Sequence, residues 1–297
     1  MTKNNIKIDE PIKKGPYIIK ELMLMIFLRY LATGSFMKVS SELCSVTKST
    51  AWKSIHLIIK SLIKQREIFI KFPDQNDLSK IEHAFRQKKG FPGVVGCVDG
   101  THIPIEVPKS DITETFRNRK GYMSLNCQMI CGPIGEIYDC ITCWPGSTHD
   151  SRVWRESRIF ERLGETISDR YHLLADSAYP ISVNLLPPFK NPNEREHRRF
   201  NYLHSATRMA IEKAYGVIKR RFPLLKFGLR FRRVADSANC IVAAVILHNI
   251  CLAHVDDIDE RDADFVPNED EIDEVNHRIV DNAGVAKRLR ILNEIFG

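Results

Sequence analysis

Four acidic residues stand out because they interrupt apolar or structured stretches of the chain. Asp99 ends the segment GVVGCVD, Asp176 ends HLLAD, Asp150 lies in WPGSTHD and Glu212 lies in SATRMAIEKAYGVIKRRF. Carboxylate oxygens are hard ligands that select Mg²⁺ or Mn²⁺. Two such ions about 4 Å apart can activate an attacking oxygen and stabilise a leaving one at a phosphodiester. If the fold brings these acids together, we expect a two-metal site for cutting nucleic acid.

Each acid also has a purely structural interpretation. Asp99 and Gly100 stand between two β-type stretches and match a type I′ hairpin turn equally well. Asp150 suits the first turn of a helix, where the helix dipole favours an acid, and Asp176 before a serine suits the start of a loop. Glu212 could be one solvated acid among many. Taken one by one, the acids leave both interpretations open.

Glu212 gains weight from its helical surroundings. On a helix, Arg208, Glu212 and Lys219 share one stripe in which cations flank the carboxylate. A site that holds both a metal and phosphates needs this arrangement, although a solvent-facing ion-pair stripe predicts the same spacing. Residues 194–233 hold twelve Lys or Arg against three acids, which favours contact with a polyanion. We therefore expect Arg208, Lys219 and Arg220 to bind nucleic acid.

The elements that must position these residues follow one another in an α/β order. Apolar spacing predicts three short helices in residues 21–72, and a turn cluster at 73–77 precedes a helix that ends at Gly90. Strands then come first as a meander and later alternate with helices, which indicates an α/β domain with a mixed sheet. The expected strands are 94–98, 103–107, 125–130, 137–143 and 171–175, and the expected helices are 150–163, 203–222 and 237–254, with a loop at 187–199.

Residues 37–59 fit a helix-turn-helix. Small Ser41 would lie at the close helix crossing, Ser45 would lie in the turn and Thr47 would cap the second helix. That helix would expose four residues toward DNA: Lys48, Ser49, Trp52 and Lys53. The turn position usually prefers glycine, so a plain three-helix packing module with Trp52 partly buried is the alternative.

Charge is distributed unevenly along the chain. The 297 residues carry a formal net charge of +7, but residues 256–282 hold twelve acids and two bases, a net of −10, so the remainder sums to +17. We expect residues 1–20 to be a flexible basic tail and residues 256–297 to be an acidic tail, within which 286–296 could form a helix. Such an acidic run could compete with DNA for the basic body.

Membrane insertion and thiolate metal binding find little support. The longest apolar run, residues 22–28, is far shorter than the roughly 18 residues of a membrane span, and no signal-peptide cleavage site follows it. We expect an intracellular protein with no membrane partner, in which the eight cysteines are reduced. Cys127, Cys131, Cys140 and Cys143 raise a zinc hypothesis, but the last two are three apart on a strand and should point to opposite faces.

Six motifs, in their order along the chain, resemble the catalytic domain of PIF/Harbinger transposases. They are GVVGCVDGTHIPI, NRKGYMSLNCQMIC, WPGSTHDSRVW, LLADSAYP, HSATRMAIEKAYGVIKRRF and VILHNICL. The resemblance runs from about Glu21 to His254. It implies an RNase H-like DDE nuclease domain at 91–255, a linker helix at 73–90 and a helix-turn-helix-like region at 21–72.

The resemblance also assigns roles to the acids. Carried over by motif, Asp99, Asp176 and Glu212 would be the catalytic acids and Asp150 a further metal ligand, with Mg²⁺ or Mn²⁺ as the cofactor. Asp99 would then lie on a central strand rather than in a turn. One departure is Ala178, where relatives often have glycine. His102 and His149 are expected to assist the site without binding metal directly.

These roles imply a divalent-metal-dependent nuclease of the DDE type that cuts phosphodiester bonds in DNA by a two-metal mechanism. The resemblance further implies a separate Myb-like DNA-binding partner, and a nuclear location with a cytoplasmic pool. Two other functions stay open. The protein could be a DNA-binding scaffold that keeps the acids without activity, or an RNase H-like enzyme acting on RNA or hybrids. The oligomeric state is not set by the sequence.

Overall fold

Five strands form one mixed sheet in the computed structural model, which describes residues 6–9, 19–107, 111–254 and 281–296. The strand order is β3-β2-β1-β4-β5, so the first and longest strand lies at the centre. β1 pairs antiparallel with β2 and β2 with β3, whereas β4 runs parallel to β1 and to β5. The predicted mixed α/β architecture is therefore confirmed. The bounds are β1 Val94–Pro104, β2 Ser124–Cys131, β3 Ile137–Pro145, β4 His172–Leu174 and β5 Leu185–Leu186.

β1 is continuous through the Asp-Gly pair. Asp99 lies opposite Met129 and Gly100 opposite Gln128, in a register that β2 keeps from Cys97 to Pro104. The hairpin-turn interpretation of residues 99 and 100 is wrong, because neighbouring β2 pairs with β1 on both sides of the Asp-Gly pair. The turn chemistry of Asp-Gly is overridden by this tertiary pairing.

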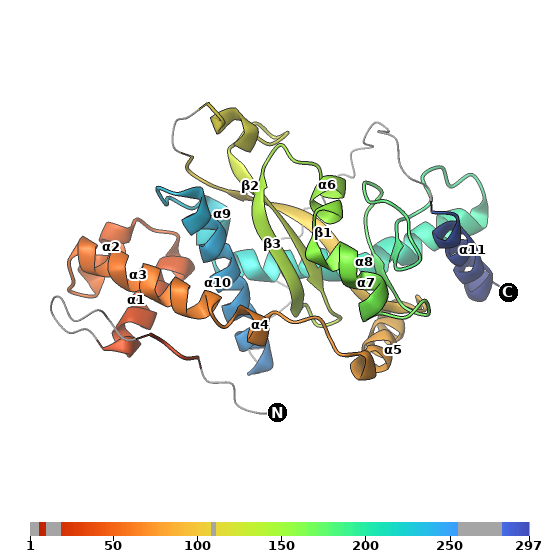
Figure 1. Ribbon diagram of the computed structural model, residues 1–297, viewed down its shortest axis with the longest axis horizontal. Coiled ribbons are helices and arrows are strands. Elements are labelled where there is room, and N and C mark those ends of the chain that lie inside the picture. The colour runs from red at the N-terminus through yellow and green to blue at the C-terminus, as the bar shows by residue number, and fades with distance from the viewer. Residues whose placement is uncertain (1–5, 10–18, 108–110, 255–280, 297) are drawn as a thin grey trace.

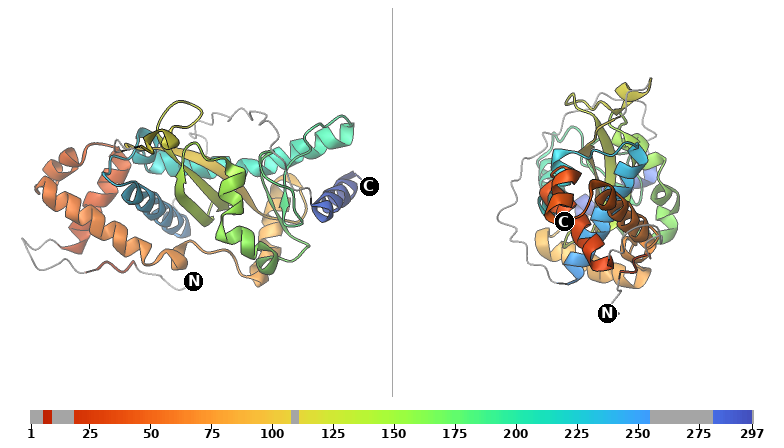
Figure 2. Two further views of the ribbon diagram at one scale, coloured as in Figure 1. Left: turned by 45° about the horizontal axis from the view of Figure 1, so that its top comes forward. Right: turned by 90° about the vertical axis from the view of Figure 1, so that its left-hand side faces the viewer.

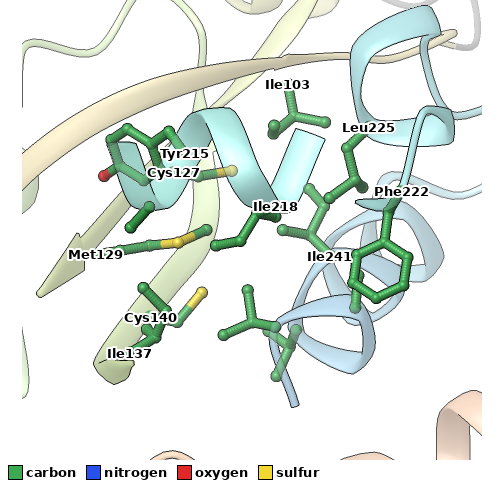
Figure 3. Packing of buried hydrophobic residues seen from close by; sticks show 14 of the residues in the cluster. Ile103, Cys127, Met129, Ile137, Cys140, Tyr215, Ile218, Phe222, Leu225 and Ile241 are labelled. Atoms are coloured by element: carbon green, nitrogen blue, oxygen red, sulfur yellow. The ribbon is translucent and has the colours of Figure 1, made fainter. Parts of the chain in front are cut away.

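The sheet is covered by helices on both faces (Figure 1). On one face α8 (Arg195–Arg221) and α10 (Val234–Ala253) pack on the strands, and Ile103, Met129 and Ile218 meet in the core between them (Figure 3). On the other face Val95 and Val98 pack with α6 (Asp150–Arg155) and α7 (Arg158–Thr166). The single helix expected at 150–163 is divided because Ser157 caps α7, its Oγ accepting from the Phe160 amide at 3.1 Å.

The N-terminal helices share the core of the sheet domain. α1 (Lys20–Thr33), α2 (Met37–Leu43) and α3 (Lys48–Ile63) lie at one end of the molecule (Figures 1 and 2), and α3 packs on α10. Buried residues of α1 and α3 belong to the same hydrophobic cluster as the strands. Lys7 and Asp9, placed in the flexible tail by their sequence, donate backbone hydrogen bonds to Gln65 and Ser61, so residues 6–9 are anchored.

The C-terminal helix α11 (Asn282–Phe296) lies at the opposite end (Figures 1 and 2) and packs on α8 and β5. Ile291 and Leu292 are buried there, and Lys287 Nζ donates to the carbonyls of Tyr171 and Val183. The last part of the expected acidic tail is thus a docked helix; residues 255–280 lie outside the described residues. The remaining elements are α4 (Arg66–Phe69), η1 (Gln75–Asp77), α5 (Leu78–Lys89), η2 (Thr113–Phe116) and α9 (Leu224–Phe227).

Two composition-based expectations can be compared with burial. α10 is the one helix, within the described ranges, that is long and apolar enough to cross a membrane, and 56% of its most apolar window is buried inside the protein. It packs on β3, α3 and α8 as a core helix does.

Cys140 is buried and Cys143 is exposed, as expected for residues on opposite faces of β3.

Candidate functional site

Three of the four predicted acids converge at the centre of the sheet. Asp99 lies in the middle of β1, Asp176 follows the parallel strand β4, and Asp150 begins α6 after β3. One carboxylate oxygen from each lies within 4.8 Å of those of the other two. The neighbouring strands β1 and β4 are parallel and Cys97 pairs with Leu174, so Asp99 and Asp176, each two residues further on, lie side by side.

Asp150 reaches the cluster because residue 100 has no side chain. A Cβ atom at Gly100 would lie 2.5 Å from Asp150 Oδ1, closer than real Cβ contacts. Asn126 holds the same carboxylate, its Nδ2 donating to Asp150 Oδ1 at 2.6 Å and to the Thr148 carbonyl at 2.8 Å. Asp176 is held by its own loop, since its Oδ1 accepts from the Ala178 amide at 2.9 Å. A backbone amide makes this contact, so alanine in place of glycine at 178 preserves it.

Glu212 stands one residue away from the cluster, behind Arg208. The Arg208 guanidinium donates to Asp99 Oδ2 at 2.8 Å and pairs with Glu212 Oε1 at 2.7 Å. Its side chain is only 7% exposed. The expectation that Arg208 binds nucleic acid therefore needs correction, because its guanidinium is buried between two carboxylates. The i, i+4 spacing on α8 produces this bridge.

The electrostatics of the cluster fit a divalent cation. Burial raises the pKa of Asp99 to about 7, and the charge of Asp150 adds to the rise while Arg208 opposes it. Three carboxylates are the donors that Mg²⁺ or Mn²⁺ prefers. Among the described residues, these three acids could hold such an ion.

The remaining predicted contacts occupy two regions. Lys219, on α8, donates from its Nζ to Thr101 Oγ1 at 2.8 Å, two residues after Asp99. The next residue of α8, Arg220, is half-buried. The four expected DNA-facing residues of α3 (Lys48, Ser49, Trp52 and Lys53) are all exposed, but they lie in the N-terminal helical region rather than at the acids. α2 and α3 are joined by a short turn in which Ser45 has φ 53° and Thr47 Oγ1 accepts from the Thr50 amide.

Several supporting residues were missed by sequence reasoning. Gly100 and Asn126 shape the position of Asp150, and the Tyr215 hydroxyl donates to the Asp99 carbonyl at 2.6 Å. Arg119 also joins the site, with its Nη2 at 2.7 Å from His149 Nδ1. None of these residues is close in sequence to the residue it supports. Strand register could have pointed only to Asn126, which lies on β2 opposite His102.

Comparisons with known proteins show what this chain is similar to. A family model described as DDE superfamily endonuclease matches residues 98–249. The protein named "Putative nuclease HARBI1" of Homo sapiens is 29% identical over 255 residues, covering 84% of this chain and 72% of its own length. "Protein ALP1-like" of Arabidopsis thaliana is 23% identical over 290 residues, covering 91% of this chain and 70% of its own. "Probable transposase for insertion sequence element IS702" of Microchaete diplosiphon is 21% identical, with coverage of 79% and 86%. No solved structure gives a significant match.

Proposed function

The chain belongs to the DDE superfamily endonucleases, and we propose that it is a divalent-metal-dependent nuclease that cuts phosphodiester bonds in DNA. A DDE endonuclease domain implies an RNase H-like fold, and the central β1 between an antiparallel pair and a parallel pair agrees with it. The observation that carries the proposal is the convergence of Asp99, Asp150 and Asp176 within 4.8 Å. The names of the relatives, a nuclease and a transposase among them, point to the same chemistry.

In this proposal each residue of the site has a defined role. Asp99, Asp150 and Asp176 would hold Mg²⁺ or Mn²⁺. Glu212 would complete the set of catalytic acids with Asp99 and Asp176. Bound in pairs, such ions polarise a phosphodiester and activate the attacking oxygen. Asn126 fixes the orientation of Asp150, and Arg208 pairs with both Asp99 and Glu212, where its charge opposes the rise in the pKa of Asp99 that burial causes. Lys219, bonded to Thr101 two residues after Asp99, would neutralise a nearby phosphate.

The exposed face of α3 provides a second contact with DNA in the same proposal. Lys48, Ser49, Trp52 and Lys53 lie on the surface of a helix whose preceding turn has one left-handed residue, as a tight helix–helix turn requires. We also propose, from the family resemblance alone, a Myb-like DNA-binding partner and a nuclear location with a cytoplasmic pool. Because α3 would contact duplex DNA in this proposal, duplex DNA should be a better substrate than an RNA–DNA hybrid.

The test is the substitution Asp176→Asn in the full chain. It removes one charge from the cluster without changing its size, so the variant should stay folded, lose cleavage in Mn²⁺ and lose most of the rise in Tm that Mn²⁺ causes. Asp74→Asn, at an exposed aspartate paired with Lys71, is the matched control and should cut like the wild type. Unchanged cutting by Asp176→Asn would refute the assignment. A wild type that binds DNA but neither cuts it nor responds to Mn²⁺ would favour the scaffold function.

A further inference from the structure

The segment Arg117–Tyr122 forms a pre-shaped loop whose tip is basic; we call it the basic loop. It lies between η2 and β2 within the motif NRKGYMSLNCQMIC. An isolated antiparallel bridge joins Arg117 to Met123, the Asn118 amide donates to the Tyr122 carbonyl at 3.0 Å, and Gly121 has the positive φ of 84° that a tight turn needs. These bonds fix the backbone and leave Arg119 and Lys120 exposed at the tip.

Arg117, one of the three cations of the loop, stabilises the fold of the loop through local bonds. Arg117 Nε and Nη2 pair with the two carboxylate oxygens of Glu114 at 2.8 and 3.1 Å, and Nη1 donates to the Gly121 carbonyl at 2.9 Å. Glu114 is thus occupied by Arg117. The charges at the tip therefore belong to Arg119 and Lys120.

The tip lies beside the acid cluster. Arg119 Nη2 is 2.7 Å from Nδ1 of His149, the residue immediately before Asp150. Burial lowers the pKa of His102 to about 4, and the charges of Lys219, Lys120 and Arg119 lower it further. His102 follows Asp99 by three residues on β1, a separation of about 10 Å along the strand.

The loop thus presents two exposed cations, Arg119 and Lys120, beside the residue that precedes Asp150. A strand of B-form DNA carries one phosphate per 3.4 Å of helix axis, so a strand whose reacting bond lies at the acids also brings neighbouring phosphates to cations beside them. We propose that the basic loop binds the DNA phosphate backbone on one side of the bond to be cut, through Arg119 and Lys120 acting with Lys219. The inference rests on the proposed nuclease function and adds the position of the substrate.

The test uses the double variant Arg119→Gln/Lys120→Gln of the full chain and a labelled 30-base-pair duplex. Binding is measured in Ca²⁺ between 50 and 300 mM salt. The matched control is Lys71→Gln/Lys80→Gln, which makes the same change in net charge at two exposed lysines whose ion pairs are with Asp74 and Asp77. Each lost phosphate contact lowers the slope of log Kd against log salt by about 0.9. We expect a slope lower by about 2 in the loop variant and an unchanged slope in the control.

A second measurement separates this inference from the nuclease function. The rise in Tm caused by Mn²⁺ should be the same in the loop variant and the wild type, because the acids are intact. Equal salt slopes in the loop variant and the control would overturn the inference. A lost Mn²⁺ response in the loop variant would also overturn it, because the loop would then act by positioning Asp150. A lower slope in a protein that does not cut DNA would leave the loop assignment standing and reject the nuclease.

Discussion

Replacing Gly100 by alanine should damage the metal site with little effect on the fold. The new Cβ would lie 2.5 Å from Asp150 Oδ1 and 2.6 Å from its Cγ, whereas ordinary contact begins at 3.4 Å. Gly100 does not have a positive φ, so the backbone accepts alanine. The carboxylate of Asp150 must therefore retreat by about 1 Å from its place in the cluster. A flexible side chain moves at modest cost, so we expect a loss of stability of about 1 kcal/mol.

The displacement has a measurable consequence for metal binding. A retreat of 1 Å is large against a metal–oxygen distance of about 2.1 Å, so we expect Mn²⁺ affinity to fall at least tenfold and cleavage to fall about 100-fold. At a Mn²⁺ concentration of 100 times the wild-type Kd, the wild type gains about 2.7 kcal/mol of stability, and a tenfold weaker variant gains about 1.4 kcal/mol. Thermal unfolding with and without Mn²⁺ measures this difference directly.

The matched control is Gly164→Ala in α7, where the nearest atom to the new Cβ is Asn184 Oδ1 at 3.9 Å. Alanine favours a helix, so this variant should be as stable as the wild type or slightly more so. Its Mn²⁺ response should be unchanged. If Gly100→Ala binds Mn²⁺ as tightly as the wild type, Asp150 is not a ligand and the reasoning about its position fails.

Two further predictions concern stability. Burial lowers the pKa of His204 to about 3, so this histidine stays neutral in the folded protein, whereas in the unfolded chain it takes up a proton below pH 6.5. The free energy of unfolding is therefore unaffected by His204 above pH 6.5 and falls as the pH drops below it, by about 2 kcal/mol at pH 5. His204→Gln should therefore lose about 2 kcal/mol less than the wild type between pH 7.5 and 5 in urea unfolding, and equal losses would contradict the assigned burial effect. Ending the chain after residue 280 removes α11 with its buried Ile291 and Leu292, which should cost about 3–6 kcal/mol, and a truncated protein with an unchanged Tm would show that α11 does not dock. Competition between the acidic run and DNA is therefore better tested by acid-to-amide substitutions in the whole chain, with DNA affinity as the readout.

The sequence predicted which acids form the site, but it did not predict the strand pairing and hydrogen bonds that hold them. The acids could be found because each interrupts an apolar or structured segment, and the motifs implied a position on a strand for Asp99 and a position after a strand for Asp176. The Asp-Gly pair misled local reasoning because turn propensity is a local property, whereas the pairing of β1 with β2 is set by residues about thirty positions away.

The role of Arg208 could not be predicted for a related reason. Its spacing on α8 showed that it shares a face with Glu212, but not whether that face meets solvent or the sheet. The structure shows the second case, since Arg208 bonds to Asp99 from across the interface between α8 and β1. In the same way, α8 begins at Arg195 rather than at residue 203, because polar residues at its start follow no apolar pattern.

The shared core of the N-terminal helices and the sheet has a consequence for where DNA would be cut. α3 packs on α10, α1 packs on α9, and their buried residues continue into those of the strands. A DNA segment bound by α3 would therefore stand at a set distance and angle from Asp99, since α3 and β1 contribute to one hydrophobic core. The packing of the helices on the sheet would then fix the number of base pairs between the DNA sequence bound by α3 and the bond that is cut.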